Sequence, residues 1–140
     1  MKAAGFQVFL EIQARGNEKK QQRRKYMSLT VTEKQSAGGV TILEVKGFID
    51  TSTSAGLEDA IKKAHEEKKI RIVLDLSGSE FISSAGWGAM VAYLKKLRST
   101  GGDLKIAAMA EKVEKVFKLM EFDSLIDAFK TVEEAVKNYK

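Results

Sequence analysis

A pair of serines stands where a buried strand gives way to a helix in this 140-residue chain. Ser83 and Ser84 follow the run Asp75-Leu-Ser-Gly-Ser-Glu-Phe-Ile, and the helix-forming run Ala85-Gly-Trp-Gly-Ala-Met-Val-Ala-Tyr-Leu comes directly after them. The first four backbone N–H groups of a helix have no partner within the helix, and the helix dipole gives this end partial positive charge. A hydroxyl placed there can cap the helix, and an anion attached to it is stabilised.

Ser84, at the expected first position of the helix, has two interpretations. In the first, its side-chain oxygen accepts a hydrogen bond from an early helical N–H group and contributes about 0.5–2 kcal/mol as an N-cap. In the second, it accepts a phosphate, which adds a charge of about −1.5 to −2 at the same helix end. The two roles are compatible, because a phosphorylated cap exchanges a hydroxyl for a dianion in a favourable field.

Residues around this pair also allow two interpretations each. Asp50 can cap the helix that follows it or supply negative charge beside Ser84. Gly86 and Gly88 cost about 1 kcal/mol each relative to Ala within a helix, so they indicate either close packing on the sheet or a bare surface for another chain. Trp87 can belong to the core or to a partner-binding surface.

The sequence offers little material for catalysis. There is no cysteine, so disulfides, thiol nucleophiles and thiolate metal sites are excluded, and His65 is the only histidine. Gly101-Gly-Asp is a turn rather than a phosphate-binding loop, and no Gly-rich dinucleotide motif follows a strand. Asp75 and Glu80 have no base or metal ligand beside them. We therefore expect no catalytic residues, metal site or cofactor; a phosphate or nucleotide site at the helix start is the minor alternative.

Length and hydropathy indicate one globular domain. No apolar run approaches the roughly 20 residues that a membrane span needs. The stretch Phe6-Gln-Val-Phe-Leu-Glu-Ile is interrupted by polar residues and does not form the apolar region of a secretory signal. We expect a cytoplasmic protein without a membrane span.

The net charge of +5 comes from the first 26 residues. Residues 1–26 hold seven of the 24 basic and two of the 19 acidic side chains, so residues 27–140 are neutral. The run 17–25 has no apolar residue and predicts a solvated segment, whereas Phe6–Ile12 alternates as a strand would. We expect these residues to be an added edge strand, a partner-binding segment, or a disordered, non-native or misassigned start before a domain at 27–140. We do not expect direct binding of nucleic acid.

Hydrophobic periodicity predicts an alternation of strands and helices. A hairpin of strands at 29–35 and 40–46 turns at Ser36-Ala-Gly-Gly39. Strands are also expected at 70–76 and 104–109, and a short extended segment at 124–127. Helices are expected from Thr51–Ser54 to about 68, at 84–98 and at 111–120. A last helix is expected after a capping box formed by Thr131 and Glu134. The order β-β-α-β-α-β-α-(β)-α predicts a single α/β domain, with a mixed sheet, an N-terminal antiparallel hairpin, parallel β-α units and about four helices.

This order and the run Phe81-Ile-Ser-Ser-Ala-Gly86 resemble the STAS domain of bacterial anti-sigma factor antagonists. In that family a strand ending in Asp-Leu-Ser leads to Phe-(Met/Ile)-Asp-Ser-(Ser/Ala/Thr)-Gly, and the serine after the Asp accepts phosphate. Asp75-Leu-Ser77 matches the strand end, and Ser84 matches the phosphoacceptor. Gly47-Phe-Ile-Asp50 is similar to the family's Gly-x-(Ile/Leu)-Asp. The resemblance covers about residues 29–139.

The resemblance implies a phosphoprotein of a partner-switching pathway in bacterial signal transduction and transcription regulation. The unphosphorylated form would bind an anti-sigma factor that is also a GHKL-type serine kinase, and would free a sigma factor. Phosphorylation at Ser84 would end that binding, and a PP2C-type phosphatase would reverse it. The partner-binding residues would be Asp50, Ser83, Ser84, Gly86 and Trp87.

Ser83 departs from the family pattern, because it stands where the family usually has Asp. It is smaller and uncharged, so it adds no repulsion against a phosphate, and it is a second candidate acceptor. A different circuit with the same fold is the alternative function: a STAS scaffold of a stress-signalling assembly, or a regulatory subunit of a transporter or lipid-transfer system. Self-association through the hairpin or through Phe6–Ile12 would favour the scaffold.

Overall fold

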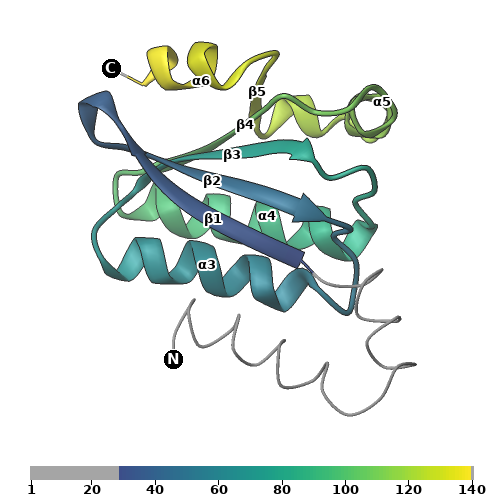
Figure 1. Cartoon of the computed structure of the whole chain (residues 1–140), viewed down its shortest axis with the longest axis horizontal. Helices are drawn as coiled ribbons and strands as arrows, with labels where there is room; N and C mark the ends of the chain where they lie inside the picture. The colour runs from purple at the N-terminus through teal and green to yellow at the C-terminus, as the bar shows by residue number, and fades with distance from the viewer. Residues whose placement is uncertain (1–28, 140) are drawn as a thin grey trace.

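Within residues 29–139, five strands form one mixed sheet in the order β1-β2-β3-β4-β5 (Figure 1). The computed structural model describes residues 29–139. The strands are β1 (Leu29–Ser36), β2 (Val40–Gly47), β3 (Arg71–Gly78), β4 (Asp103–Ala107) and β5 (Asp127–Phe129). The β1–β2 pair is antiparallel and the remaining pairs are parallel. The predicted mixed sheet with an N-terminal hairpin is confirmed.

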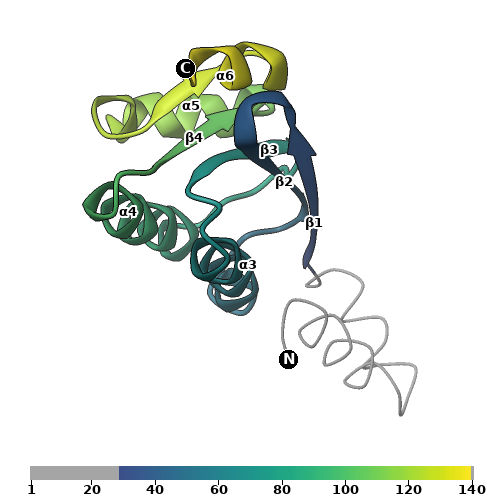
Figure 2. The ribbon, with the colours of Figure 1, turned by 90° about the vertical axis from the view of Figure 1, so that its left-hand side faces the viewer.

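Four helices of the described residues pack on this sheet: α3 (Ser54–Glu66), α4 (Ser84–Ser99), α5 (Glu111–Leu119) and α6 (Val132–Asn138). Figures 1 and 2 show α3 and α4 together on one face of the sheet and α6 on the other. The larger core lies beneath α3 and α4, and α5 adds Val113 and Phe117 to it. A smaller core lies under α6, around Val73 and Ala135.

The central strand β3 shows why this topology suits the sequence. Its nearly continuous apolar run sends Ile72, Leu74 and Leu76 into the larger core and Val73 into the smaller one, and all four are fully buried. Period-two alternation places successive side chains on opposite faces, so only a strand covered on both faces requires such a run. The prediction of a central strand at 70–76 is confirmed.

Several predicted boundaries are wrong. The strand expected at 104–109 is β4, which ends at Ala107 because Ala108 has a left-handed φ of 61°. The extended segment expected at 124–127 is instead a 3-10 turn at Phe122–Ser124, followed by β5 at Asp127–Phe129. The turn persists because the N–H groups of Leu125 and Ile126 both donate to the carbonyl of Phe122, and pairing with β4 begins only at Asp127. Helix α3 ends at Glu66 rather than at Lys68, whose φ of 66° is left-handed and cannot continue a helix.

Helix α6 begins with most of the predicted capping box. The Thr131 hydroxyl accepts from the N–H of Glu134 at 3.1 Å, as expected. The Glu134 carboxylate reaches back to the N–H of Lys130, one residue earlier than the reciprocal bond of the motif. The predicted extension at 1–26 lies outside the described residues. Between residues 29 and 139, no helix has the length and apolar character to cross a membrane.

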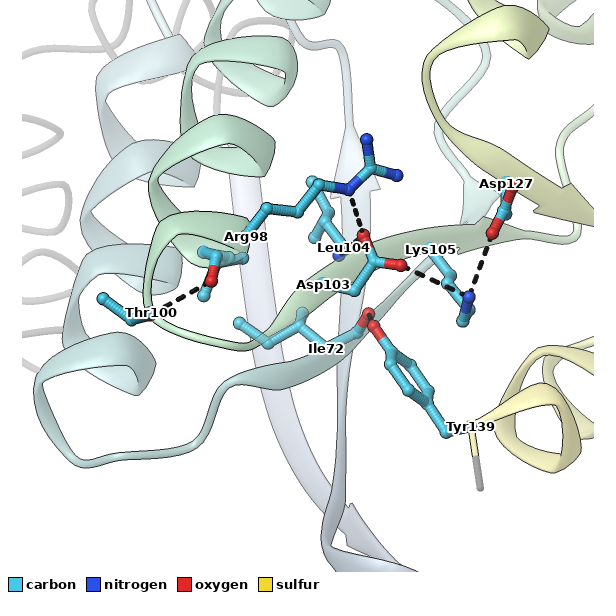
Figure 3. Close-up of polar contacts among 9 residues, drawn as sticks. Ile72, Arg98, Thr100, Asp103, Leu104, Lys105, Asp127 and Tyr139 are labelled. Carbon is cyan, nitrogen blue, oxygen red and sulfur yellow. Dashed lines mark hydrogen bonds and ion pairs between the residues drawn. The ribbon is translucent and has the colours of Figure 1, made fainter.

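A buried lysine fastens the C-terminal end of the domain to the sheet (Figure 3). Lys105, 5% exposed on β4, places its Nζ 3.0 Å from Asp127 and 3.4 Å from Asp103. The same Nζ lies 4.7 Å from the ring centroid of Tyr139, at a cation–π distance. The Tyr139 hydroxyl donates to the carbonyl of Ile72 at 2.9 Å. These contacts join β3, β4, β5 and the end of α6.

Tyr139→Phe should lower the free energy of unfolding by about 0.5–1.5 kcal/mol, because it removes the hydrogen bond to Ile72 and keeps the ring. Tyr93→Phe is the control, since the described residues offer its hydroxyl no hydrogen-bond partner. Urea unfolding at neutral pH measures both. Equal stability of the two variants and the wild type would show that the Tyr139 bond contributes nothing.

The same variant should respond differently to alkali. Burial, followed by the nearby carboxylate of Asp103, raises the pKa of Tyr139 in the folded state. The folded state therefore disfavours the ionised phenolate. Its contribution to the free energy of unfolding is fully present below the ordinary pKa of 10.0 and declines as the pH rises above it. The wild type should therefore lose more stability above pH 10 than Tyr139→Phe, in the same urea measurement.

Candidate functional site

Two segments lie side by side beyond the ends of β2 and β3. The N–H of Ile49 donates to the carbonyl of Phe81 at 2.9 Å, and the N–H of Ser83 donates to the carbonyl of Ile49 at 2.8 Å. Ile49 and Ile82 form an isolated parallel bridge. This pairing fixes the start of α4 against the segment that ends in Asp50.

Ser83, and not Ser84, caps helix α4. Ser83 has an extended backbone (φ −81°, ψ 172°), and its hydroxyl accepts from the N–H of Gly86 at 3.3 Å. The interpretation of Ser84 as the N-cap is therefore wrong. An N-cap needs a non-helical backbone, which the bond to Ile49 gives to Ser83, whereas Ser84 is already helical.

The Ser84 side chain is consequently uncommitted. It is exposed as the first residue of α4, and its hydroxyl has no hydrogen-bond partner among residues 29–139. Ser and Asp are about equally good N-caps. Ser83 thus supplies the capping oxygen without placing a charge next to Ser84.

Asp50 closes a turn in front of α3 and does not cap that helix. Its Oδ1 accepts from the N–H and hydroxyl of Ser52 and from the N–H of Thr53. Thr53 occupies the N-cap position, and its hydroxyl donates to the carbonyl of Phe48 instead of accepting from the helix. The predicted capping role of Asp50 is therefore wrong.

The hydrogen bonds of this turn favour the ionised form of the Asp50 carboxyl. Burial acts to raise the pKa of the carboxyl, but the hydrogen bonds from Ser52 and Thr53 outweigh burial and hold the pKa below its usual range. Because Ile49 pairs with Ile82 and Ser83, this carboxylate lies on the segment adjacent to Ser84.

The two glycines of α4 differ in their surroundings. A Cβ on Gly86 would lie 2.6 Å from Cγ2 of Ile49 and 3.0 Å from Cγ2 of Ile82. A Cβ on Gly88 would meet nothing within 4 Å. Close packing therefore explains Gly86, while Gly88 leaves a bare and exposed helix surface.

Trp87 lies in the core and is 2% exposed. Its ring stacks on Phe122 at a centroid distance of 5.2 Å and packs against Phe117 at 5.5 Å. Its Nε1 has no hydrogen-bond partner within the part of the chain that the structure describes. Of the two interpretations of Trp87, the core position is the one observed.

The site includes two exposed aromatics, which belong to the motifs at 47–50 and 81–86 but for which no binding role is predicted from the sequence. Phe48 and Phe81 are 43% and 49% exposed, and their rings meet edge to face at 5.9 Å. Each precedes an isoleucine, Ile49 or Ile82, that is buried. The two parallel Phe-Ile pairs are a recognisable signal, because alternation that turns both isoleucines inward turns both aromatics outward.

The Ser84 hydroxyl has no histidine near it. Nε2 of His65 lies 2.9 Å from the hydroxyl of Thr100, just after the C-terminal end of α4. Ser84 starts that helix, about 24 Å away at 1.5 Å per residue. Among residues 29–139, no group of three or more His, Asp or Glu could hold a metal ion. The site combines an accessible hydroxyl, a carboxylate and an exposed aromatic pair.

Comparisons with known proteins agree on one family. The model of the STAS domain matches residues 31–135. The anti-sigma-F factor antagonist RsfB of Mycobacterium tuberculosis is 32% identical over 111 residues, which cover 78% of this chain and 88% of that protein. A crystal structure of an anti-sigma factor antagonist from Mycobacterium paratuberculosis has a TM-score of 0.72 at 26% identity, covering 79% of this chain and 93% of that chain.

The fold extends to more distant proteins. The Bacillus cell fate determinant SpoIIAA, solved in its phosphorylated form, has a TM-score of 0.61 at 16% identity. The match covers 79% of this chain and 100% of that one. At this identity the likeness establishes a common fold.

Ser83→Ala should lower the free energy of unfolding by about 0.5–2 kcal/mol, because it removes the oxygen that caps α4. Ser84→Ala is the matched control and should change it little, since the Ser84 hydroxyl has no partner to lose among the described residues. Chemical denaturation compares the two. A larger loss in Ser84→Ala would reverse the assignment of the cap.

Gly86→Ala should destabilise the protein by about 1–3 kcal/mol, because the added methyl group overlaps Ile49. Gly88→Ala, two residues along the same helix, should stabilise it by about 0.5–1 kcal/mol through helix propensity in open space. Thermal unfolding of the pair tests this. Stabilisation by both substitutions would contradict the close packing at Gly86.

Proposed function

The chain belongs to the STAS domain family, and from that premise we propose that it is an anti-sigma factor antagonist switched by phosphorylation of Ser84. In its unphosphorylated form it binds an anti-sigma factor that is also a GHKL-type serine kinase, and so releases a sigma factor. The kinase transfers phosphate to Ser84 and the complex separates. A PP2C-type phosphatase restores the binding form.

The observation that carries this proposal is the uncommitted hydroxyl of Ser84 beside an exposed aromatic pair. Ser83 performs the capping, so modification of Ser84 breaks no hydrogen bond within the described residues. Phe48 and Phe81 offer apolar surface that a partner can desolvate. An interface that covers both features is sensitive to one new charge at Ser84.

The effect of phosphate follows from its charge. A phosphoserine carries about −1.5 to −2 charge, and α4 can stabilise it at its N-terminus. The neighbouring Asp50 is ionised, because its hydrogen bonds keep its pKa low. Phosphate therefore raises the negative charge of this edge without disturbing the fold. A partner surface packed there would have to desolvate that charge, which weakens binding.

In this proposal the protein is the substrate of the reaction and not an enzyme. The Ser84 hydroxyl attacks the γ-phosphorus of the ATP bound to the kinase, its proton passes to a base of the kinase, and ADP leaves. That the single histidine lies at the other end of α4 supports this division, because the described residues provide no histidine to activate Ser84.

Incubation with an anti-sigma factor kinase from the same genome and ATP should place phosphate on Ser84, as mapped by mass spectrometry. The signal should vanish in Ser84→Ala and persist in Ser83→Ala, although Ser83 is a neighbouring hydroxyl. Phosphate found only at Ser83, or only elsewhere in the chain, would contradict the assignment of the acceptor.

Charge at Ser84 should also weaken binding directly. Ser84→Asp should reduce affinity for the same anti-sigma factor by at least about tenfold, as measured by calorimetry. Ser77→Asp adds the same charge at an exposed serine on β3 and should bind normally. Equal losses in both variants would indicate a nonspecific charge effect. Absence of binding by the wild type would instead favour the scaffold function.

A further inference from the structure

A cleft of about 180 Å³ opens between the Phe81 segment and α5. Its apolar lining comes from two sides: Phe81, Ile82 and Trp87 on one, and Val113 and Val116 on the other. Glu80 and Lys112 complete the lining. Their side chains form an ion pair at 3.5 Å and are 70% and 68% exposed. The cleft is thus apolar within and bears one charge of each sign.

We propose that this cleft receives an apolar side chain of the anti-sigma factor. This inserted side chain is the anchor of the interface that Ser84 switches. The inference rests on the proposed function and adds to it the place where most of the affinity arises. Its occupant is one branched aliphatic or aromatic side chain of the partner protein.

The size and lining of the cleft define the occupant. An apolar protein cavity of about 150 Å³ accommodates benzene, so a cleft of this volume has room for one such side chain. An apolar lining gives a charged or strongly polar group nothing to offset the loss of its hydration. Anchors of this kind, seated in a pocket and ringed by more polar contacts, dominate the energetics of protein interfaces.

The position of the cleft ties it to Ser84. Trp87, in the cleft wall, lies one helical turn after Ser84 on α4, where residues three apart are neighbours. Phe81 belongs both to the cleft and to the exposed pair with Phe48. A partner that covers Ser84 and the aromatic pair therefore extends over the mouth of the cleft.

The exposure of the lining indicates a protein partner rather than a small ligand. Val113 and Trp87 are buried, whereas Phe81 and Val116 remain 49% and 42% exposed. Exposed apolar surface thus continues outward from the cleft over Phe81, whose ring contacts the exposed ring of Phe48. A single small molecule would leave that surface in water, while a protein that inserts one side chain covers part of it as well.

The cleft and Ser84 then have different roles in binding. The apolar anchor supplies affinity in the unphosphorylated state. Phosphate at Ser84 disfavours close contact with the partner and so prevents the anchor from entering the cleft. Loss of the anchor should raise the KM of the kinase for this protein and leave its kcat nearly unchanged, because Ser84 itself is intact.

A matched pair of variants on α5 tests the anchor. Val116→Gln places an amide in the cleft lining, whereas Leu119→Gln makes a comparable change three residues away at a side chain that is 80% exposed and outside the cleft. Both sites are exposed and Gln is a good helix former, so both variants should fold. Calorimetry with the anti-sigma factor should give at least about fivefold weaker binding for Val116→Gln and less than twofold change for Leu119→Gln.

The only tryptophan of the chain provides a second readout. A ¹⁵N-labelled sample has a single indole N–H signal, from Trp87 in the cleft wall. Addition of unlabelled anti-sigma factor should shift that signal, and should shift it only at higher partner concentration in Val116→Gln. An indole signal that stays in place at saturating partner would overturn the anchor.

These outcomes separate the two proposals. Normal binding by Val116→Gln together with weak binding by Ser84→Asp would overturn the anchor and leave the switch intact. Equal losses in Val116→Gln and Leu119→Gln would move the contact to the outer face of α5 and also overturn the anchor. A wild-type protein that binds no anti-sigma factor would remove the proposed function itself.

Discussion

The pairing of Ile49 with the segment around Ile82 is the constraint on which the site depends. Its two backbone hydrogen bonds, to Phe81 and from Ser83, hold the two loops together past the ends of β2 and β3. The fully buried side chain of Ile49 then packs where Gly86 has no Cβ, so α4 can start directly against this loop. The same pairing leaves Ser83 extended, which is the conformation that an N-cap requires.

Separation of the cap at Ser83 from the proposed acceptor at Ser84 follows from this geometry. Because Ser83 satisfies the N–H of Gly86, the proposed phosphate on Ser84 would break no hydrogen bond among the described residues. Asp and Ser are comparable caps, so Ser83 caps the helix without placing a carboxylate next to Ser84. Adjacent residues therefore have separate roles: Ser83 stabilises the start of α4, and Ser84 is the proposed site of the added charge.

Periodicity and turn chemistry were sufficient to predict the sheet, the four helices and the position of the serine pair. Alternating or continuous apolar runs report directly on burial, as in β3, where every second residue enters the larger core. What could not be predicted depends on contacts between distant segments. The choice between Ser83 and Ser84 as cap is decided by Ile49, which lies more than 30 residues away in sequence. The exposure of Phe48 and Phe81 follows from the bridge between the two loops, and the position of β5 follows from its register with β4.

The central claim is that phosphate at Ser84 changes the interface and leaves the fold unchanged. The most direct measurement compares the unphosphorylated protein with protein carrying phosphoserine only at position 84, in both affinity for the anti-sigma factor and thermal unfolding. The account predicts at least about a hundredfold loss of affinity, equivalent to about 2.7 kcal/mol, with nearly the same midpoint of unfolding. Equal affinity of the two forms, or a large fall in the midpoint on phosphorylation, would contradict it.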